Sequence, residues 1–320
     1  MFFFVHIPKT AGTSFRHGLA KVPNVNLMLA YHSHRDRDER LLALTTREEG
    51  EALIRTLDPG KLHIIAGHVP YEQYATLTPP EQVLSLVRNP IERALSAYQH
   101  IAWATPGEVT DLRSFLQQEN MSDRQTKMLR SLDLDRAQVG LNSHYAEYLD
   151  IVRHSPGLDV PPLTKNRTSG ERTRSRGRLP ADLIREAFTR NEQDVMLLYS
   201  VAERFEHRLR RLGFRTTPEG GSAFQLALDR DLHVNGRLKA SPMDTGIVSL
   251  AVNGERRAIT RLEVNGDKGI HRFQYPLALL GVGPGDTVAA SLLNAPQTRG
   301  TLKVPQLRLQ WLRLVSRLAS

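Results

Sequence analysis

The chain has 320 residues, of which 40% are hydrophobic, and it carries a net charge of +9 with a pI near 10.0. This length suits about two domains with ordinary buried cores, and no apolar run approaches the ~20 residues of a membrane-spanning helix. The sequence has no cysteine, which excludes disulfides and thiolate metal sites and leads us to expect a cytoplasmic protein, while the basic excess favours an anionic partner.

Short apolar runs and helical patterns alternate from the first residues to about residue 213. The apolar runs are typical of strands buried on both faces, and the helical patterns place apolar residues three and four apart. We therefore predict an α/β fold, with a P-loop-like parallel sheet flanked by helices. In the helix predicted at 90–104, Asn89 is the N-cap and Pro90 the first residue. The predicted strands are FFFVHI (2–7), KLHIIAGH (61–68) and QVLSLVR (82–88), and the predicted helices cover 45–57, 90–104 and 183–212.

The sequence pattern changes after about residue 217. Residues 247–277 contain short alternating segments joined by Asn-Gly turns, and DTVAASLL (286–293) predicts a further strand. This spacing predicts a small all-β sandwich. With the boundary in TTPEGGS (216–222), the expected domains are 1–216 and 222–320.

The stretch HIPKTAGTSF (6–15) follows the first predicted strand and enters a helical pattern. Such a turn presents backbone N–H groups and the positive end of a helix to an anion, and Lys9 adds a full charge. Here the lysine precedes Gly12, whereas in triphosphate loops of the GxxxxGK[ST] type it follows the last glycine, so a nucleotide kinase is less favoured. Phosphate or sulfate binding is the prediction, and an ordinary strand-to-helix turn is the alternative.

A second candidate anion site lies in VRNPIERALSAY (87–98). Arg88 stands at the end of a predicted strand, and Ser96 lies about two turns into the next helix. A guanidinium matches a phosphate through paired N–H groups, and a hydroxyl can complete such a site. The alternative is a surface ion pair and a serine at the edge of the core. Farther on, residues 165–178 carry six Lys or Arg against one Glu, which predicts either a solvated linker or a basic lid over a polyanion.

Together, the two stretches resemble the 5′-phosphosulfate loop and the 3′-phosphate element of sulfotransferases that use 3′-phosphoadenosine-5′-phosphosulfate (PAPS). The likeness is closest to carbohydrate sulfotransferases of the heparan sulfate 2-O-sulfotransferase kind and their bacterial relatives. AGHVPYEQY (66–74) looks like the catalytic-histidine stretch of that family, and RQTKMLRSL, VGLNSHYAEYLDIV and TKNRTSG look like later family segments. The likeness runs from about Phe2 to Gly213.

The resemblance implies a sulfotransferase fold over 1–216 and transfer of a sulfuryl group from PAPS to a hydroxyl of a glycan or glycan-like acceptor, acidic acceptors included. His68 would be the general base, and Lys9 would stabilise the charge that grows on the leaving phosphate. The implied reaction needs no metal ion and leaves 3′-phosphoadenosine-5′-phosphate (PAP). The implied donor-binding residues are Lys9, Thr10, Ala11, Gly12, Thr13, Ser14, Arg88, Ser96, Arg167 and Thr168.

The histidines depart from the family pattern in one respect. The family's 2-O-sulfotransferases have a second histidine two residues before the base, where this chain has Ala66, which leaves the acceptor open. A binding protein without a working base is therefore an alternative to an enzyme. A nucleic-acid partner is not expected, because no basic motif is interleaved with aromatic residues. His6 is expected to support the loop; the acceptor-side candidates are His32, His34, Lys165, Arg172, Arg174 and Arg176, and His100 is a weaker candidate base.

Overall fold

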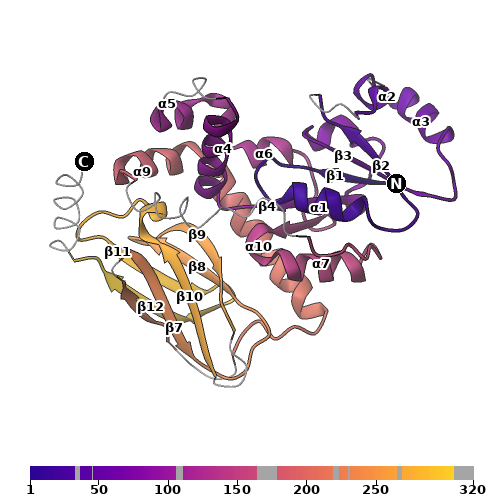
Figure 1. Cartoon of the computed structure of the whole chain (residues 1–320). Coiled ribbons are helices and arrows are strands. Elements are labelled where there is room, and N and C mark those ends of the chain that lie inside the picture. The colour runs from indigo at the N-terminus through magenta and orange to yellow at the C-terminus, as the bar shows by residue number, and fades with distance from the viewer. Residues whose placement is uncertain are drawn as a thin grey trace. The chain divides into compact units, whose positions relative to one another are not determined.

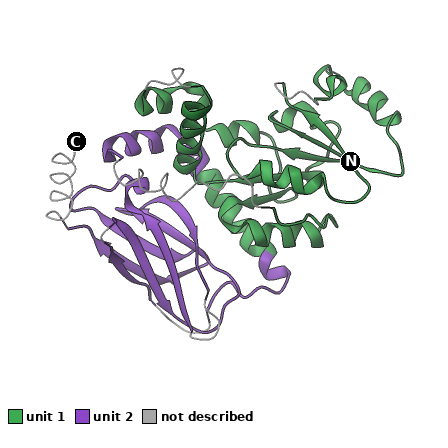
Figure 2. Cartoon of the chain, in the orientation of Figure 1, with its two compact units in different colours: residues 1–167, 196–208 green, residues 168–195, 209–320 purple. Residues whose placement is uncertain are grey.

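The computed structural model describes residues 1–32, 37–44, 46–105, 111–163, 179–218, 223–229, 231–264 and 269–305 (Figure 1). The chain divides into two compact units, shown in Figure 2: unit 1 comprises 1–167 and 196–208, and unit 2 comprises 168–195 and 209–320. The helix α10 (Glu192–Arg211) contributes residues to both units. The domain limits at 216 and 222 stay a prediction.

Unit 1 is built on a five-stranded parallel sheet in the order β2-β3-β1-β4-β5. Alternate residues of a strand point to opposite faces, and the central strand β1 is buried on both. Phe3 packs edge-on against Tyr74, with ring centroids 5.2 Å apart, and Phe4 packs against Phe15 at 4.8 Å. This two-sided burial explains why β1, β3 and β4 are readable as continuous apolar runs. The strands are β1 (Phe2–Val5), β2 (Val25–Ala30), β3 (Leu62–Gly67), β4 (Val83–Val87) and β5 (Gln138–Leu141).

Helices flank this sheet and follow its strands along the chain. The helix α4 has the predicted bounds, Pro90–Ala104, with Asn89 at its N-cap position. The predicted helix at 45–57 is shorter, because Thr46 and Glu49 form a capping box that begins α3 at Arg47. The helices of this part are α1 (Gly12–Leu19), α2 (Glu39–Leu42), α3 (Arg47–Arg55), α4, α5 (Leu112–Gln117), α6 (Arg124–Met128) and α7 (Tyr145–His154), with short 3-10 helices η1 (Tyr71–Tyr74), η2 (Pro80–Gln82), η3 (Glu119–Met121) and η4 (Asn142–His144).

The single helix predicted at 183–212 is wrong: the structure has two helices, α9 (Ala181–Arg190) and α10. The chain leaves the helical conformation at Asn191, where φ is −121° and ψ is 31°. The buried Asn191 side chain donates from Nδ2 to the carbonyl oxygen of Ala187 at 2.8 Å. An asparagine that bonds the local backbone in this way competes with helix propagation, which apolar spacing alone does not reveal.

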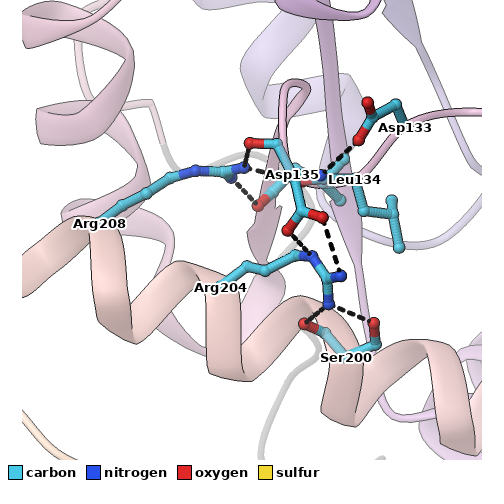
Figure 3. A network of polar contacts seen from close by, with 7 residues as sticks. Asp133, Leu134, Asp135, Ser200, Arg204 and Arg208 are labelled. Atoms are coloured by element: carbon cyan, nitrogen blue, oxygen red, sulfur yellow. Dashed lines mark hydrogen bonds and ion pairs between the residues drawn. The ribbon is translucent and has the colours of Figure 1, made fainter.

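Two arginines of α10 hold the turn that leads into β5 (Figure 3). Arg204 donates from Nε to Asp135 Oδ1 at 2.6 Å and from Nη1 to Ser200 Oγ at 2.7 Å. Arg208 donates from Nη2 to the carbonyl oxygen of Leu134 at 2.9 Å. Residues 196–208 are therefore an integral part of unit 1.

Unit 2 contains two antiparallel sheets, as the predicted change to short strands indicates. One sheet has the order β10-β7-β6 and the other β12-β11-β8-β9. Buried residues alternate along β10 and β11, and Phe224 packs edge-on against Phe273 at 5.4 Å between ring centroids. Each sheet thus covers one apolar face, the pattern of a sandwich. The elements are β6 (Gln225–Leu228), β7 (His233–Lys239), β8 (Ile247–Val252), β9 (Glu255–Arg261), β10 (Ile270–Pro276), β11 (Thr287–Leu292) and β12 (Ala295–Lys303), with η6 (Leu277–Leu280).

The helix α9 belongs to unit 2 and is tied to its strand connections. Arg185 donates from Nε to the carbonyl oxygen of Gly281 at 2.8 Å and from Nη2 to Asp286 Oδ2 at 2.7 Å. The guanidinium of Arg257, on β9, lies over the Phe188 ring at 4.8 Å. The β unit therefore includes a helix that precedes it in the sequence.

Candidate active site

The candidate site lies at the carboxyl ends of the parallel strands, around β1 and β4. These two strands are neighbours, but the connection from β1 leads toward β2 on one side and that from β4 toward β5 on the other. Ligands of open α/β sheets bind at such a switch point, beyond the carboxyl ends of the strands. Lys9 follows β1 there, and Arg88 directly follows β4.

The turn after β1 has an unusual backbone conformation. Lys9 and Ala11 have φ values of 71° and 75°, in the left-handed region that residues with a side chain seldom adopt. The buried Thr10 hydroxyl between them donates to the carbonyl oxygen of Ile7 at 2.9 Å. Ala11 is the N-cap of α1, whose first turn, Gly-Thr-Ser-Phe, brings no carboxylate to this positive helix end. The predicted residues from Lys9 to Ser14 thus form one strained turn and helix start, where an anion is favoured.

Gly12 is required by the side chain beneath the turn. A Cβ atom on Gly12 would lie 1.9 Å from Cδ2 of His6. His6 is buried, and its Nδ1 lies 2.6 Å from the Tyr31 hydroxyl. Burial, followed by the effects of His68, Arg16 and Lys9, lowers the pKa of His6 to about 2, so the ring is neutral. This placement agrees with the expectation that His6 supports the loop.

Arg88 connects the two predicted anion-binding stretches. Its Nη1 donates to the carbonyl oxygen of Lys9 at 3.3 Å, and its Nε donates to Glu92 Oε2 at 3.2 Å. Burial and then the charge of Arg88 lower the pKa of Lys9, which places the two cations in one electrostatic environment. A negatively charged ligand at this point would relieve their mutual repulsion.

One face of α4 continues the site. Glu92, Ser96 and His100 are four residues apart, so their side chains lie on the same side of the helix. Glu92 at one end pairs with Arg88, and the charge of Lys9 is the main cause that lowers the pKa of His100 at the other. The partly exposed Ser96 lies between them, on the face directed toward the turn.

Gln125, on α6, holds the backbone of Arg88. The Arg88 N–H donates to Gln125 Oε1 at 2.8 Å, and Gln125 Nε2 donates to the Arg88 carbonyl oxygen at 2.9 Å. The sequence analysis did not predict this role, although Gln125 lies in RQTKMLRSL, a stretch that resembles a later segment of the family. The two residues are 37 positions apart, and only the tertiary structure brings them together.

His68 follows β3, and it lies beside the turn because the end of β3 pairs with the end of β1, Gly67 with Val5. Its side chain keeps an exposed part, while the ring packs edge-on against His6 and Tyr31 with centroids 4.5 and 4.7 Å away. Loss of water around the packed part, followed by the charges of Arg124 and Arg16, lowers the pKa of His68 to about 4. A neutral imidazole that can accept a proton is therefore present at pH 7.

Three further side chains around His68 were not predicted. The Arg16 guanidinium lies over the Tyr31 ring at 5.3 Å, so α1 and the end of β2 meet beside His68. Arg124 begins α6, immediately before Gln125. An arginine in a helix and a tyrosine after a strand are common in any sequence, so no local signal distinguishes these residues.

Several predicted residues do not join this cluster. His32 is exposed in a turn, where its carbonyl oxygen accepts a hydrogen bond from Arg37 Nη1 at 2.8 Å. Ala66 is buried in β3. His34, Lys165, Arg167, Thr168, Arg172, Arg174 and Arg176 lie outside the described residues, as does the rest of the basic stretch.

Within the described ranges, no His, Asp and Glu side chains gather in a group of three or more that could hold a metal ion. The helices of the same ranges include none with both the length and the apolar character needed to cross a bilayer.

Comparisons with known proteins find little similarity. No family model matches the chain, and no curated protein matches it. Among solved structures, it is similar to the one titled "Crystal Structure of Sulfotransferase from Alicyclobacillus acidocaldarius", with 19% identity and a TM-score of 0.39 over 65% of this chain and 95% of that chain. Similarity this low decides neither fold nor activity.

Proposed function

We propose that the chain is a sulfotransferase that moves a sulfuryl group from PAPS to a hydroxyl of a glycan or glycan-like acceptor. The observation that carries this proposal is the contact between Arg88 Nη1 and the Lys9 carbonyl oxygen, which joins the two anion-binding elements at the β1/β4 switch point. A donor with phosphate groups at both its 5′ and 3′ positions needs two such elements at a fixed separation.

In the proposed complex, the turn from Lys9 to Ser14 binds the 5′-phosphosulfate. Its helix N-terminus and Lys9 supply positive potential without an acidic residue in the first turn. Arg88 and Ser96 bind the 3′-phosphate, Arg88 through paired N–H groups and Ser96 through its hydroxyl. Arg167 and Thr168 remain proposed donor contacts on the strength of the resemblance alone.

The proposed chemistry is an in-line transfer. The neutral His68 ring takes the proton of the acceptor hydroxyl as the acceptor oxygen bonds to sulfur. The bond between sulfur and the bridging phosphate oxygen breaks, and its electron pair stays on that oxygen, where Lys9 stabilises the new charge. The products are a sulfate ester, PAP and a protonated His68, which releases its proton to solvent.

The proposal is tested by calorimetric titration with PAP, adenosine 5′-phosphate and ATP, followed by transfer of labelled sulfuryl from PAPS to a panel of glycans. We expect tighter binding of PAP and transfer to at least one glycan. Equal affinities would contradict the assignment of Arg88 and Ser96. Tight PAP binding without transfer to any acceptor would favour a nucleotide-binding protein without catalysis, and binding of ATP in preference to PAP would favour a kinase.

A further inference from the structure

The end of β4 is held by a side chain in place of a strand. Val87, the last residue of β4, pairs with Leu141 of β5, and Arg88 is the first residue beyond this ladder. There the Gln125 amide accepts from the Arg88 N–H at 2.8 Å and donates to the Arg88 carbonyl oxygen at 2.9 Å. Because an amide side chain offers one acceptor and one donor group side by side, it satisfies both backbone groups at once.

These two hydrogen bonds to the backbone determine the point from which the Arg88 side chain extends. With the N–H and carbonyl groups fixed, the Cα–Cβ direction of Arg88 is fixed as well. The guanidinium then reaches the Lys9 carbonyl oxygen and Glu92, and only 18% of the side chain stays exposed. Paired N–H donors bind a phosphate well only in a defined orientation, so the affinity for that phosphate depends on how the backbone is held.

The position of α6 around Gln125 is also maintained by burial and by a backbone hydrogen bond. Gln125 has no exposed surface, and its neighbours Met128 and Leu129 on the same short segment are also buried, at 3% and 4% exposure. The Leu129 N–H donates to the Gln125 carbonyl oxygen at 3.0 Å. An apolar side chain of the same length is therefore expected to keep α6 in place while it removes both bonds to Arg88.

We propose that Gln125 is the positioning residue that gives this site its preference for a nucleotide with a 3′-phosphate. The inference rests on the proposed function, because it takes Arg88 as the partner of that phosphate. Gln125 itself touches no reacting group; it acts through the backbone of Arg88. The 5′ end of the nucleotide lies at the turn from Lys9 to Ser14, which Arg88 contacts only through its bond to the Lys9 carbonyl oxygen, so its binding should depend less on the amide than the binding of the 3′-phosphate does.

The test compares Gln125→Met with Gln138→Met, each titrated with PAP and with adenosine 5′-phosphate. Gln138 is a second buried glutamine of unit 1, on β5, and its side chain is not among the contacts of Arg88. We expect Gln125→Met to weaken PAP binding about tenfold, since buried backbone groups lose their partners, and to change binding of adenosine 5′-phosphate less than about twofold. Gln138→Met should leave the ratio of the two affinities unchanged.

Gln125→Glu provides a second variant if Gln125→Met loses its near-ultraviolet circular dichroism. A carboxylate can still accept from the Arg88 N–H but cannot donate to the carbonyl oxygen, so PAP binding should weaken here too. A wild-type chain that fails to prefer PAP would refute the proposed function itself. A wild-type preference that survives in both Gln125 variants, or an equal loss of both affinities, would overturn the role of Gln125 alone.

Discussion

Two turns with left-handed residues show how differently the two units use their backbones. In unit 2, Asn253 and Gly254 connect β8 to β9 with φ values of 51° and 88°. These are the residue types that adopt such angles at low cost, and the two-residue hairpin requires them. In unit 1, Lys9 and Ala11 adopt φ values of 71° and 75°, at a cost of about 1–2 kcal/mol each for residues with a Cβ.

The difference shows which of the two conformations depends on its surroundings. The two residues of the hairpin turn adopt their angles at low cost by themselves, and a Cβ on Gly254 would meet no atom within 4 Å, although the Asn253 side chain also bonds Asp286 and Thr287. The turn at Lys9 is maintained by contacts from elsewhere: Arg88 on the Lys9 carbonyl oxygen and the His6 ring under Gly12. Strain of this kind persists where the surrounding structure compensates for it, which is common at functional sites.

The largest expected effect is a loss of transfer rate when a histidine of unit 1, but not one of unit 2, is replaced. His68→Ala should reduce the rate of sulfuryl transfer by ~10²-fold or more with donor affinity nearly unchanged, because a general base contributes ~10²–10⁴. The control His233→Ala, on β7 of unit 2, should keep the rate. In the wild-type enzyme, the single-turnover rate should fall as the pH drops through about 4, where His68 becomes protonated. An active His68→Ala variant with an unchanged pH profile would remove His68 from the mechanism.

A matched pair of glycine substitutions probes the two turns directly. Gly12→Ala places its Cβ against the His6 ring, and we expect a loss of about 1–3 kcal/mol in stability and about tenfold in PAP affinity. Gly254→Ala strains only the hairpin, where φ is 88°, at about 1 kcal/mol, and should leave PAP affinity unchanged. Urea unfolding and calorimetry measure both quantities. Equal PAP affinity in the two variants would show that the contact beneath Gly12 does not shape the site.

The buried His6 makes the stability of unit 1 depend on pH. Its pKa is about 2 in the folded protein, whereas the unfolded chain protonates it near ~6.5. The unfolded state therefore binds more protons below pH ~6.5, and the His6 contribution lowers the free energy of unfolding by about 1.4 kcal/mol per pH unit as the pH falls. His6→Phe should reduce this slope, measured by urea unfolding from about pH 6 to about pH 4. Parallel slopes for the variant and the wild type would contradict the burial effect.

The smallest expected effect concerns strain alone. Ala11→Gly relieves the left-handed conformation at φ 75° and should raise stability by up to about 1 kcal/mol, less the entropy that glycine adds to the unfolded chain. Asn253→Gly should instead lower stability, because asparagine already tolerates its φ of 51° and the change removes the side-chain hydrogen bonds of Asn253 to Asp286 and Thr287. Thermal unfolding of both variants measures the difference. A stabilisation by Asn253→Gly equal to that by Ala11→Gly would show that the two turns are strained alike.

The sequence predicted those parts of the fold that local patterns encode. Continuous apolar runs located β1, β3 and β4, and the Asn89-Pro90 start located α4. It did not predict β2 or β5 as strands, and it joined α9 to α10 across Asn191, whose side-chain bond to Ala187 interrupts the helix.

The residues of the candidate site likewise fall into those that a local sequence pattern predicts and those that only long-range contacts reveal. Lys9 and Gly12 were predicted because they lie in the turn between an apolar run and a helical pattern, and Arg88 because it stands at the end of an apolar run. Gln125 and Tyr31 were not, since they act across 37 and 25 positions of sequence, on Arg88 and His6. Contacts over such separations depend on the order of strands in the sheet, which a single sequence does not display.

The attachment of α9 to unit 2 has a consequence for how the chain folds as it is synthesised. Residues 168–195 of unit 2 leave the ribosome before residues 196–208, which complete unit 1. The helix α9 has buried side chains, among them Leu183 and Phe188. These side chains remain without the strands of unit 2, and Phe188 without its partner Arg257, until nearly the whole of unit 2 is synthesised. Domains usually fold in the order of their synthesis. In this chain, residues 196–208 of α10 must therefore pack into unit 1 before the strands of unit 2, to which the start of α10 belongs, have been synthesised.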